Sequence, residues 1–254
     1  MKIALQLYSV RNDLERDVEK TLERIKSTGI QAVEVAPLPP GISPRLLAKR
    51  LKEFELEVAA MHCELPRGDN AGPILDATRE LSCGNLIWHG WPRDSRFDSL
   101  KGVETLAAEC NDANAAARAQ GMQFGLHNHW WEFETIDGKY LYRVLVENLS
   151  PEIFLEIDVY WAQTAGMNPT AIIRELEART SFLHLKDGPA IQGQPMQALG
   201  QGVLDFPTII QASSKADWGV IEFDECATDI WEAVRQSCEY LSKFVPRPLR
   251  SCGL

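Results

Sequence analysis

The sequence predicts a single (β/α)8 barrel, with residues 1–254 forming one domain. Short apolar runs alternate with amphipathic stretches of helical length from end to end, and eight such pairs can be counted. Each pair takes about 30 residues, the length of one strand–helix–strand step. An open doubly wound sheet is the alternative, but the first run continues as QLYSVRNDLE, which lacks the glycine-rich phosphate loop of that fold.

The predicted strands are short apolar runs that end in polar residues. In chain order they are IALQLYS from Ile3, QAVEVAP from Gln31, EVAAMHC from Glu57, NLIWHGW from Asn85, QFGLHNH from Gln123, IFLEIDVYW from Ile153, SFLHLKDG from Ser181 and WGVIEFDE from Trp218. The late GQG segment between the last two strands continues as VLD, so we interpret it as a loop rather than a nucleotide-binding motif.

Capping residues mark the ends of the helices between these strands. An apolar stripe runs along residues 13–27 and stops at Gly29, a residue type that favours the left-handed helix terminus. Ser43 supplies an N-cap oxygen, and a proline follows it in the first turn. The helices predicted from such signals cover or begin at 13–27, Ser43, 107–120, Asn168, Asp205 and Asp229.

Composition excludes several classes of protein. Lysine and arginine total 26 against 36 acidic residues, and the net charge of −10 disfavours nucleic acid and anionic membranes as partners. No apolar run approaches the roughly 18 residues that cross a bilayer, and the first residues do not resemble a secretory signal, so we expect a cytoplasmic protein. The spacing of the cysteines predicts reduced thiols, mostly buried, at Cys63, Cys83, Cys110, Cys226, Cys238 and Cys252.

Metal-capable side chains collect where the predicted strands end. Barrel enzymes have their active sites at this end of the strands. A single such residue is more often a satisfied core group, but a series of them indicates a site. The series consists of Glu34, His62, Glu64, His89, His127, His129, Asp158, His184, Lys186, Glu222 and Asp224, and it includes all 5 histidines of the chain.

Four of these residues form a candidate metal site. His127, Asp158, His184 and Glu222 come from four successive strands and offer two imidazoles and two carboxylates. A mixed nitrogen and oxygen set suits one divalent ion, manganese first, with zinc, cobalt, iron(II) or magnesium also open, and it disfavours calcium.

The ordered motifs QLYSVR, LHNHWWEFE, LEIDVYWAQTAGMNP, FLHLKDG, GQGVLDF and VIEFDE resemble the xylose isomerase-like barrels. This family includes sugar and sugar-phosphate isomerases, epimerases and inosose dehydratases, and the resemblance covers nearly the whole chain. It implies a metal ion held at the ends of strands five to eight, which places the ligands at His127, Asp158, His184 and Glu222.

The chain departs from many members of the family on strand five. They carry Glu-Asn-His there, with the glutamate as ligand and as one of two acid/base carboxylates, whereas this chain reads His127-Asn128-His129. Either His127 replaces that ligand, with His129 or Lys186 as the second proton carrier, or His129 itself binds the metal ion.

Aromatic residues near the ligands suggest a sugar or cyclitol as substrate. The tryptophans are Trp88, Trp91, Trp130, Trp131 and Trp161, which either face a sugar ring or fill the top of the barrel as core. We assign substrate binding to Glu34, His62, Trp161 and Glu132, although Glu132 could instead cap the short helix that follows, and Gln6 and Tyr8 are ambiguous in the same way.

The predicted activity is metal-dependent isomerisation or epimerisation of a sugar or keto-sugar. Glu222 would remove a proton next to a carbonyl to give an enediolate, and His129 or Lys186 would return it. Dehydration of the inosose dehydratase type begins with the same step and stays open. An endonuclease-like phosphodiesterase and a non-catalytic sugar-binding barrel are the weaker alternatives, and a homo-oligomer is compatible with the sequence.

Overall fold

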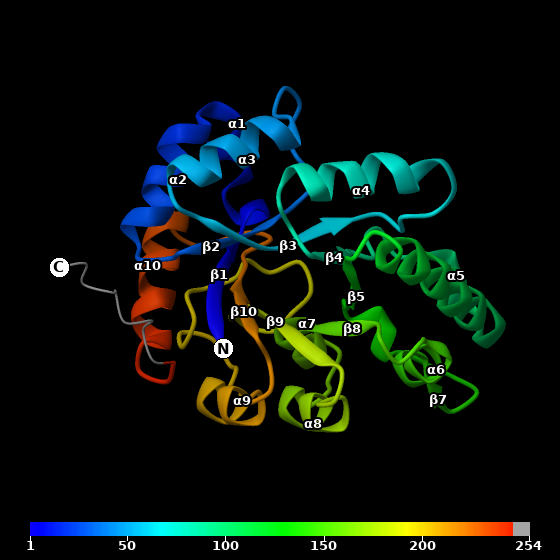
Figure 1. Ribbon diagram of the computed structural model, residues 1–254. Helices are drawn as coiled ribbons and strands as arrows, with labels where there is room; N and C mark the ends of the chain where they lie inside the picture. Colours follow the sequence, from blue (N-terminus) through cyan, green and yellow to red (C-terminus); the bar gives the residue numbers. More distant parts are fainter. Residues whose placement is uncertain (246–254) are drawn as a thin grey trace.

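Eight parallel strands close into a barrel in the computed structural model, which describes residues 1–245 (Figure 1). The strands are β1 (Lys2–Gln6), β2 (Ala32–Val35), β3 (Glu57–Cys63), β4 (Asn85–Trp88), β5 (Gln123–His127), β8 (Phe154–Asp158), β9 (Thr180–Leu185) and β10 (Trp218–Ile221). Their order around the barrel is β1-β10-β9-β8-β5-β4-β3-β2. The predicted (β/α)8 barrel is confirmed, and each predicted strand is present.

Helices surround the strands, as Figure 1 shows. They are α1 (Arg11–Arg16), α2 (Val18–Ser27), α3 (Pro44–Glu53), α4 (Ala71–Glu80), α5 (Leu100–Arg118), α6 (Leu141–Asn148), α7 (Val159–Thr164), α8 (Pro169–Glu175), α9 (Phe206–Ala212) and α10 (Ile230–Leu241). The sequence did not predict the antiparallel hairpin of β6 (Thr135–Ile136) and β7 (Lys139–Tyr140) after β5.

Two predicted helices have different bounds in the structure. The helix expected over residues 13–27 is interrupted at Asp17, whose backbone is extended and whose carboxylate accepts a hydrogen bond from the Lys20 N–H at the start of α2. The helix expected over residues 107–120 begins earlier, because Ser99 caps α5 by accepting from the Gly102 N–H. The capping residues therefore set the bounds of both helices. The apolar stripe alone did not predict the break at Asp17, and the alanine-rich composition alone did not predict the start of α5.

The barrel interior is built in layers, because every second residue of a strand points inward. The lowest layer is apolar and comprises Ala4, Ala32, Ala59, Ala60, Ile87, Phe154, Phe182, Trp218 and Val220. Phe154 stacks on Phe182 with ring centroids 5.3 Å apart, and Phe182 stacks on Trp218. Two residues further along these strands the interior becomes polar. The candidate site therefore lies on top of these apolar residues, which we call the apolar floor.

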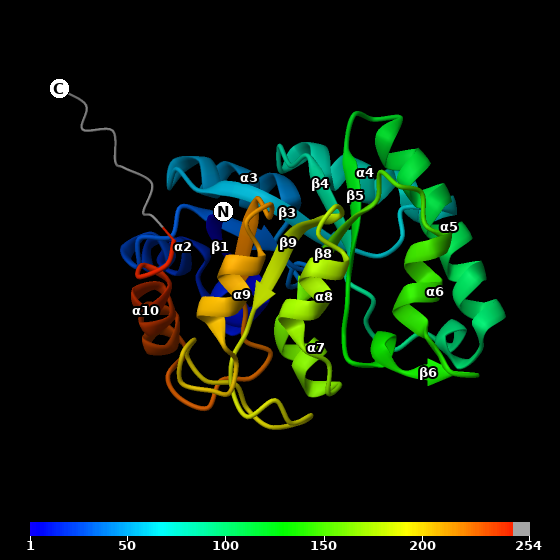
Figure 2. The ribbon, with the colours of Figure 1, turned by 90° about the horizontal axis from the view of Figure 1, so that it is seen from below.

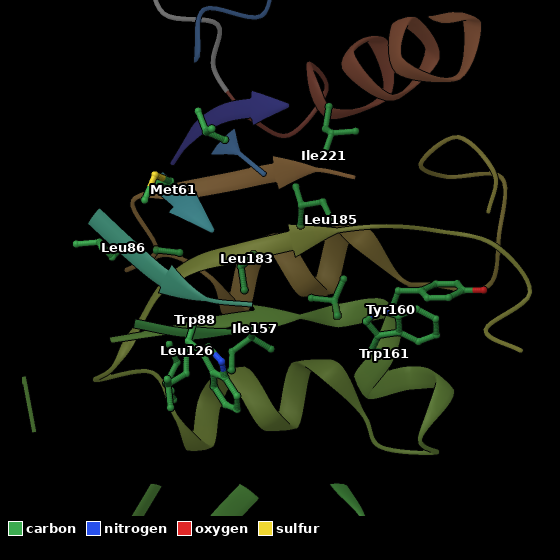
Figure 3. Packing of buried hydrophobic residues seen from close by; sticks show 14 of the residues in the cluster. Met61, Leu86, Trp88, Leu126, Ile157, Tyr160, Trp161, Leu183, Leu185 and Ile221 are labelled. Carbon is green, nitrogen blue, oxygen red and sulfur yellow. The ribbon is translucent and has the colours of Figure 1, made fainter. Parts of the chain in front are cut away.

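The outward-facing residues of the strands pack under the helices. Figure 3 shows Trp88, Leu126 and Ile157 side by side, and all three are buried. No helix within residues 1–245 is long and apolar enough to cross a membrane. The thiols of Cys63, Cys83 and Cys110 are buried as predicted, Cys226 and Cys238 are partly exposed, and Cys252 lies outside the described residues.

Gly125→Ala is expected to destabilise the protein by about 1–3 kcal/mol, since overpacking a filled core has a cost of this size. A Cβ at Gly125 would overlap the Phe154 ring, which fills the barrel floor at this position. Gly84→Ala is the matched control, because a Cβ there meets nothing within 4 Å. Urea unfolding of both variants tests this, and equal stabilities would show that Phe154 can move aside at no cost.

Candidate metal centre

The barrel brings the four predicted ligands together at its mouth. His127 and Asp158 end β5 and β8, His184 is the penultimate residue of β9, and Glu222 directly follows β10. One ligand atom from each of the four side chains lies within 4.8 Å of every other, and all four residues are buried. These residues could hold a metal ion, which is the arrangement expected from their positions in the sequence.

The imidazole of His127 offers a lone pair to this centre. Burial and the neighbouring histidines hold the pKa of His127 well below 6.5, so its ring is neutral as a ligand must be. Its Nε2 lies 3.3 Å from Asp158 Oδ2. The Nδ1 atom of His184 lies 2.7 Å from Glu222 Oε2. Burial lowers the pKa of His184, but the charges of Glu156 and Glu222 outweigh it and raise the pKa well above 6.5. A cation bound at this centre would displace the Nδ1 proton.

Charge at the centre also favours a divalent cation. Four carboxylates, from Glu34, Glu156, Asp158 and Glu222, are buried within a chamber whose one lysine is Lys186. Burial and the neighbouring Glu34 raise the pKa of the Glu156 carboxyl, and the nearby His62 and His184 lower it in part. A bound divalent ion would neutralise the excess of negative charge, so the residues present fit such a cofactor.

Lys186 adds an ammonium group beside two of the four ligands. Its Nζ lies 2.6 Å from Glu222 Oε2, 3.0 Å from Asp158 Oδ2 and 2.8 Å from Asp224 Oδ2. Burial alone would lower the pKa of Lys186, but these carboxylates outweigh it and raise the pKa well above 10.5. Burial raises the pKa of Glu222, yet the charges of Lys186 and His184 hold it well below 4.5, so Glu222 is ionised.

A loop after β9 is anchored next to Lys186. The Asp187 carboxylate, which is fully buried, accepts backbone hydrogen bonds from Gly188, Gly200, Gly202 and Leu204. The loop between β9 and α9, drawn in yellow in Figure 2, extends beyond the strands at the end toward which β9 points. The GQG segment is therefore a loop element, as predicted, and its backbone N–H groups bind Asp187 rather than a phosphate.

A second polar layer lies beneath the metal centre. The Nε2 atom of His62 lies 3.0 Å from Glu34 Oε1 and 2.7 Å from Glu156 Oε2, and His184 Nε2 lies 2.7 Å and 3.2 Å from the same two oxygens. Gln6 completes this inner ring by donating from its Nε2 to Glu34 Oε1 at 2.6 Å. His62 and Glu34, assigned to the substrate from the sequence, thus contact each other below the ligands, and their role toward a substrate stays a prediction.

Sequence reasoning missed two residues of the site. Glu156 was read as part of an apolar run, although it precedes Asp158 by two residues and therefore shares its inward face. Asn128 lies between the two histidines of strand five and pairs with the backbone of Asp158, accepting from its N–H at 3.0 Å. Glu156 could have been found from the sequence, because it lies two residues before the predicted ligand Asp158 in the same strand.

His129 is close to the metal centre but is held by other contacts. Its ring stacks on Trp131 with centroids 4.2 Å apart and lies 4.8 Å from the ring of His127. Its backbone N–H donates to Glu132 Oε2 at 2.9 Å, so Glu132 holds the turn after β5. The other carboxylate oxygen of Glu132 is buried without a hydrogen-bond partner, and the assignment of Glu132 to the substrate stays a prediction.

The tryptophans divide between the core and the mouth. Trp88 and Trp131 are core residues, whereas Trp91 is 56% exposed and packs against His129, Trp130 and Trp131. The ring of Trp161 lies 5.5 Å from Lys186 Nζ, and Figure 3 shows this residue with Tyr160 on α7, just past β8. The core interpretation therefore applies to Trp88 and Trp131, and a role for Trp91 or Trp161 toward a sugar ring stays a prediction.

The family model described as xylose isomerase-like TIM barrel matches residues 22–244. This chain belongs to that family. The resemblance seen in the ordered motifs is thus confirmed. None of the curated proteins matches the sequence.

Solved structures similar to this xylose isomerase-like barrel include isomerases, epimerases and a dehydratase. A sugar phosphate isomerase/epimerase from Parabacteroides distasonis ATCC 8503 has a TM-score of 0.81 at 20% identity, over 97% of this chain and 99% of that one. An L-ribulose 3-epimerase has a TM-score of 0.72 at 18% identity, over 96% and 94%. The probable 3-DHS dehydratase involved in petrobactin synthesis from Bacillus anthracis has a TM-score of 0.74 at 13% identity, and the match covers 95% of this chain and 99% of that one.

The two strand-five histidines of this family member are expected to respond differently to substitution. His127→Ala should weaken manganese binding, while His127→Glu should retain it because a carboxylate is a good oxygen donor for manganese. His129→Gln should leave the metal content near that of the wild type, since His129 is outside the group of four. The measurement is the number of metal ions bound per chain. If His129→Gln lost the metal ion and His127→Ala kept it, His129 would be the ligand instead of His127.

Proposed function

We propose that the protein is a divalent-metal-dependent isomerase or epimerase of a sugar or keto-sugar. The observation that carries the proposal is the buried group of His127, Asp158, His184 and Glu222, with an ionised glutamate and a charged lysine in contact. A cation held by these four residues would polarise a carbonyl and a neighbouring hydroxyl of the bound substrate. The N and O donors favour manganese, with zinc, cobalt, iron(II) and magnesium as alternatives.

Glu222 is the proton acceptor in this proposal. Its carboxylate is ionised, and Glu222 is the one carboxylate of the group of four with any exposed surface, 6% against 0% for Asp158. Lys186 Nζ lies 2.6 Å from Glu222 Oε2 and is protonated, so it orients the base. Lys186 is also one candidate for returning the proton to the substrate. Return of the proton to the opposite face of the same carbon is epimerisation, and return to the neighbouring carbon is isomerisation.

Substrate recognition would use the groups around this centre. Trp161 and Trp91 offer aromatic faces to a sugar or cyclitol ring, and Glu132, His62 and Glu34 offer hydrogen-bonding groups. His129 is the second candidate for proton return, since its Nδ1 has no hydrogen-bond partner within the described residues. The acidic net charge of −10 supports a substrate other than nucleic acid and a protein that does not bind anionic membranes.

Dehydration is the second candidate activity. It would begin with the same proton removal by Glu222, after which a β-hydroxyl leaves from the enediolate instead of the proton returning. The similarity to the probable 3-DHS dehydratase from Bacillus anthracis supports this alternative at the level of the fold.

A deuterium-exchange screen tests the proposal. The protein, loaded with manganese, is incubated in deuterated water with a panel of keto-sugars and inososes, and deuterium at the carbon next to the carbonyl is measured by NMR. Exchange that needs the metal supports proton abstraction, and the product formed separates isomer, epimer and dehydrated sugar. A protein that binds sugars with equal affinity before and after chelation, and exchanges no proton, would be a binding barrel instead.

A further inference from the structure

The inner ring below the metal centre contains more polar groups than its position in a barrel core requires. Glu34, His62, Glu156 and His184 meet there, at 8% exposure or less, and each imidazole Nε2 faces one oxygen from each carboxylate. Burying two carboxylates has a large cost in free energy unless their partners have good geometry.

By residue type the inner ring could hold a second metal ion. Its N···O separations of 2.7, 2.7, 3.0 and 3.2 Å are those of hydrogen bonds instead. Four ligand atoms bound at about 2.1 Å to one tetrahedral ion would be separated by about 3.4 Å. The ring is therefore a hydrogen-bonded layer, in which the imidazoles donate and the carboxylates accept.

His184 belongs to both layers through its two ring nitrogens. Its Nε2 donates to Glu34 Oε1 at 2.7 Å, while its Nδ1 faces the metal centre, 2.7 Å from Glu222 Oε2 and 3.9 Å from Asp158 Oδ2. A proton fixed on Nε2 leaves the Nδ1 lone pair for a cation. A histidine whose ring orientation and tautomer are set in this way is a better metal ligand.

Glu34 is itself held in place. Its Oε1 accepts from Gln6 and His184 and lies 3.0 Å from His62 Nε2, while its Oε2 has no hydrogen-bond partner. Gln6 is fixed in turn, because its amide oxygen accepts from the Tyr8 N–H. The chain of contacts runs from the backbone after β1 through Gln6 and Glu34 to His184.

We propose that Glu34 is a positioning residue for the metal centre, which fixes His184 in the Nε2–H form so that Nδ1 faces the ion. The inference rests on the metal dependence proposed above and deepens it. Glu156 is the partner of His62 rather than of His184, because its shorter contact, 2.7 Å, is to His62 Nε2, and its distance to His184 Nε2 is 3.2 Å.

Glu34→Gln and Glu156→Gln form a matched pair of variants for the test. Each removes one buried negative charge from the same ring, but only the first weakens the main acceptor of His184. We expect the manganese Kd to rise by about 10- to 100-fold in Glu34→Gln, the range found when such partners of ligating histidines are changed. In Glu156→Gln the rise should be clearly smaller, and an equal rise in both variants would assign the effect to charge alone and overturn the proposal.

Ring signals give a readout independent of turnover. With zinc as a diamagnetic probe and 15N-labelled histidine, the His184 Nε2–H of the wild type should exchange slowly with water, because a buried carboxylate accepts it. In Glu34→Gln this proton should exchange faster, and in Glu156→Gln it should not. An unchanged exchange rate in Glu34→Gln contradicts the proposed role.

Gln6→Leu covers the case in which Glu34→Gln does not fold. It keeps the Glu34 charge and removes one hydrogen bond that orients it, so the manganese Kd should rise about 3- to 10-fold, the value of one hydrogen bond. An unchanged Kd in Gln6→Leu would overturn the proposal. A wild-type protein that binds no divalent ion would instead refute the proposed function, so the two failures are distinguishable.

Discussion

Glu222→Gln is expected to slow exchange of the substrate C–H proton by about 100- to 10,000-fold, the usual contribution of a general base. The amide keeps the shape of the side chain and an oxygen near His184, but it has no basic lone pair comparable to that of the carboxylate. The measurement is the initial rate of deuterium incorporation at saturating manganese, so that a weaker affinity for the ion does not account for the loss.

Asp224→Asn is the control for this variant. Asp224 contacts the same Lys186 ammonium, at 2.8 Å, but it is outside the group of four possible ligands. Its substitution should leave exchange within about tenfold of the wild type, since it removes one contact of an ion pair rather than the base. Exchange at the wild-type rate in Glu222→Gln would move the base elsewhere, with His129 as the next candidate.

Asp158→Asn is expected to lose bound manganese, with the affinity reduced by more than about 100-fold, since it removes a charged ligand rather than a neighbour of one. Activity should fall in parallel. The asparagine keeps the hydrogen bond from the Trp161 N–H by which Asp158 caps α7, so the fold should be retained. Metal per chain after dialysis, measured together with the unfolding midpoint, checks both statements.

Asp229→Asn provides a matched comparison at a helix cap. Asp229 caps α10 by accepting from the backbone N–H groups of Trp231 and Glu232, and it is outside the group of four possible ligands. This variant should resemble Asp158→Asn in stability and the wild type in metal content. Full metal content in Asp158→Asn would remove Asp158 from the ligand set.

The barrel could be predicted from the sequence because its signals repeat. Each strand is a short apolar run, and the helices that follow have local caps such as Ser43 and Asp205. The missed features depend on single residues: Asp17 divides one predicted helix, and the β6–β7 hairpin is only two residues long on each side. Such features are set by individual contacts rather than by periodicity.

The gathering of these four side chains could also be predicted, because the barrel topology alone places His127, Asp158, His184 and Glu222 at one mouth. Their partners could not be predicted in the same way. Glu156 lies inside a strand that reads as apolar, and the contact of Lys186 with Asp158 joins side chains from two neighbouring strands. Strand five ends at His127, so alternation along a strand does not fix His129, whose position depends on stacking with Trp131.

The apolar floor determines how molecules reach the chamber. Phe154, Phe182 and Trp218 stack across the barrel below the inner ring, so water and solutes reach the polar layers from the mouth. If the proposed reaction takes place here, substrate and product would share one passage, and the product would have to leave before the next substrate could approach Glu222. Substrate and product would then compete for the same form of the protein.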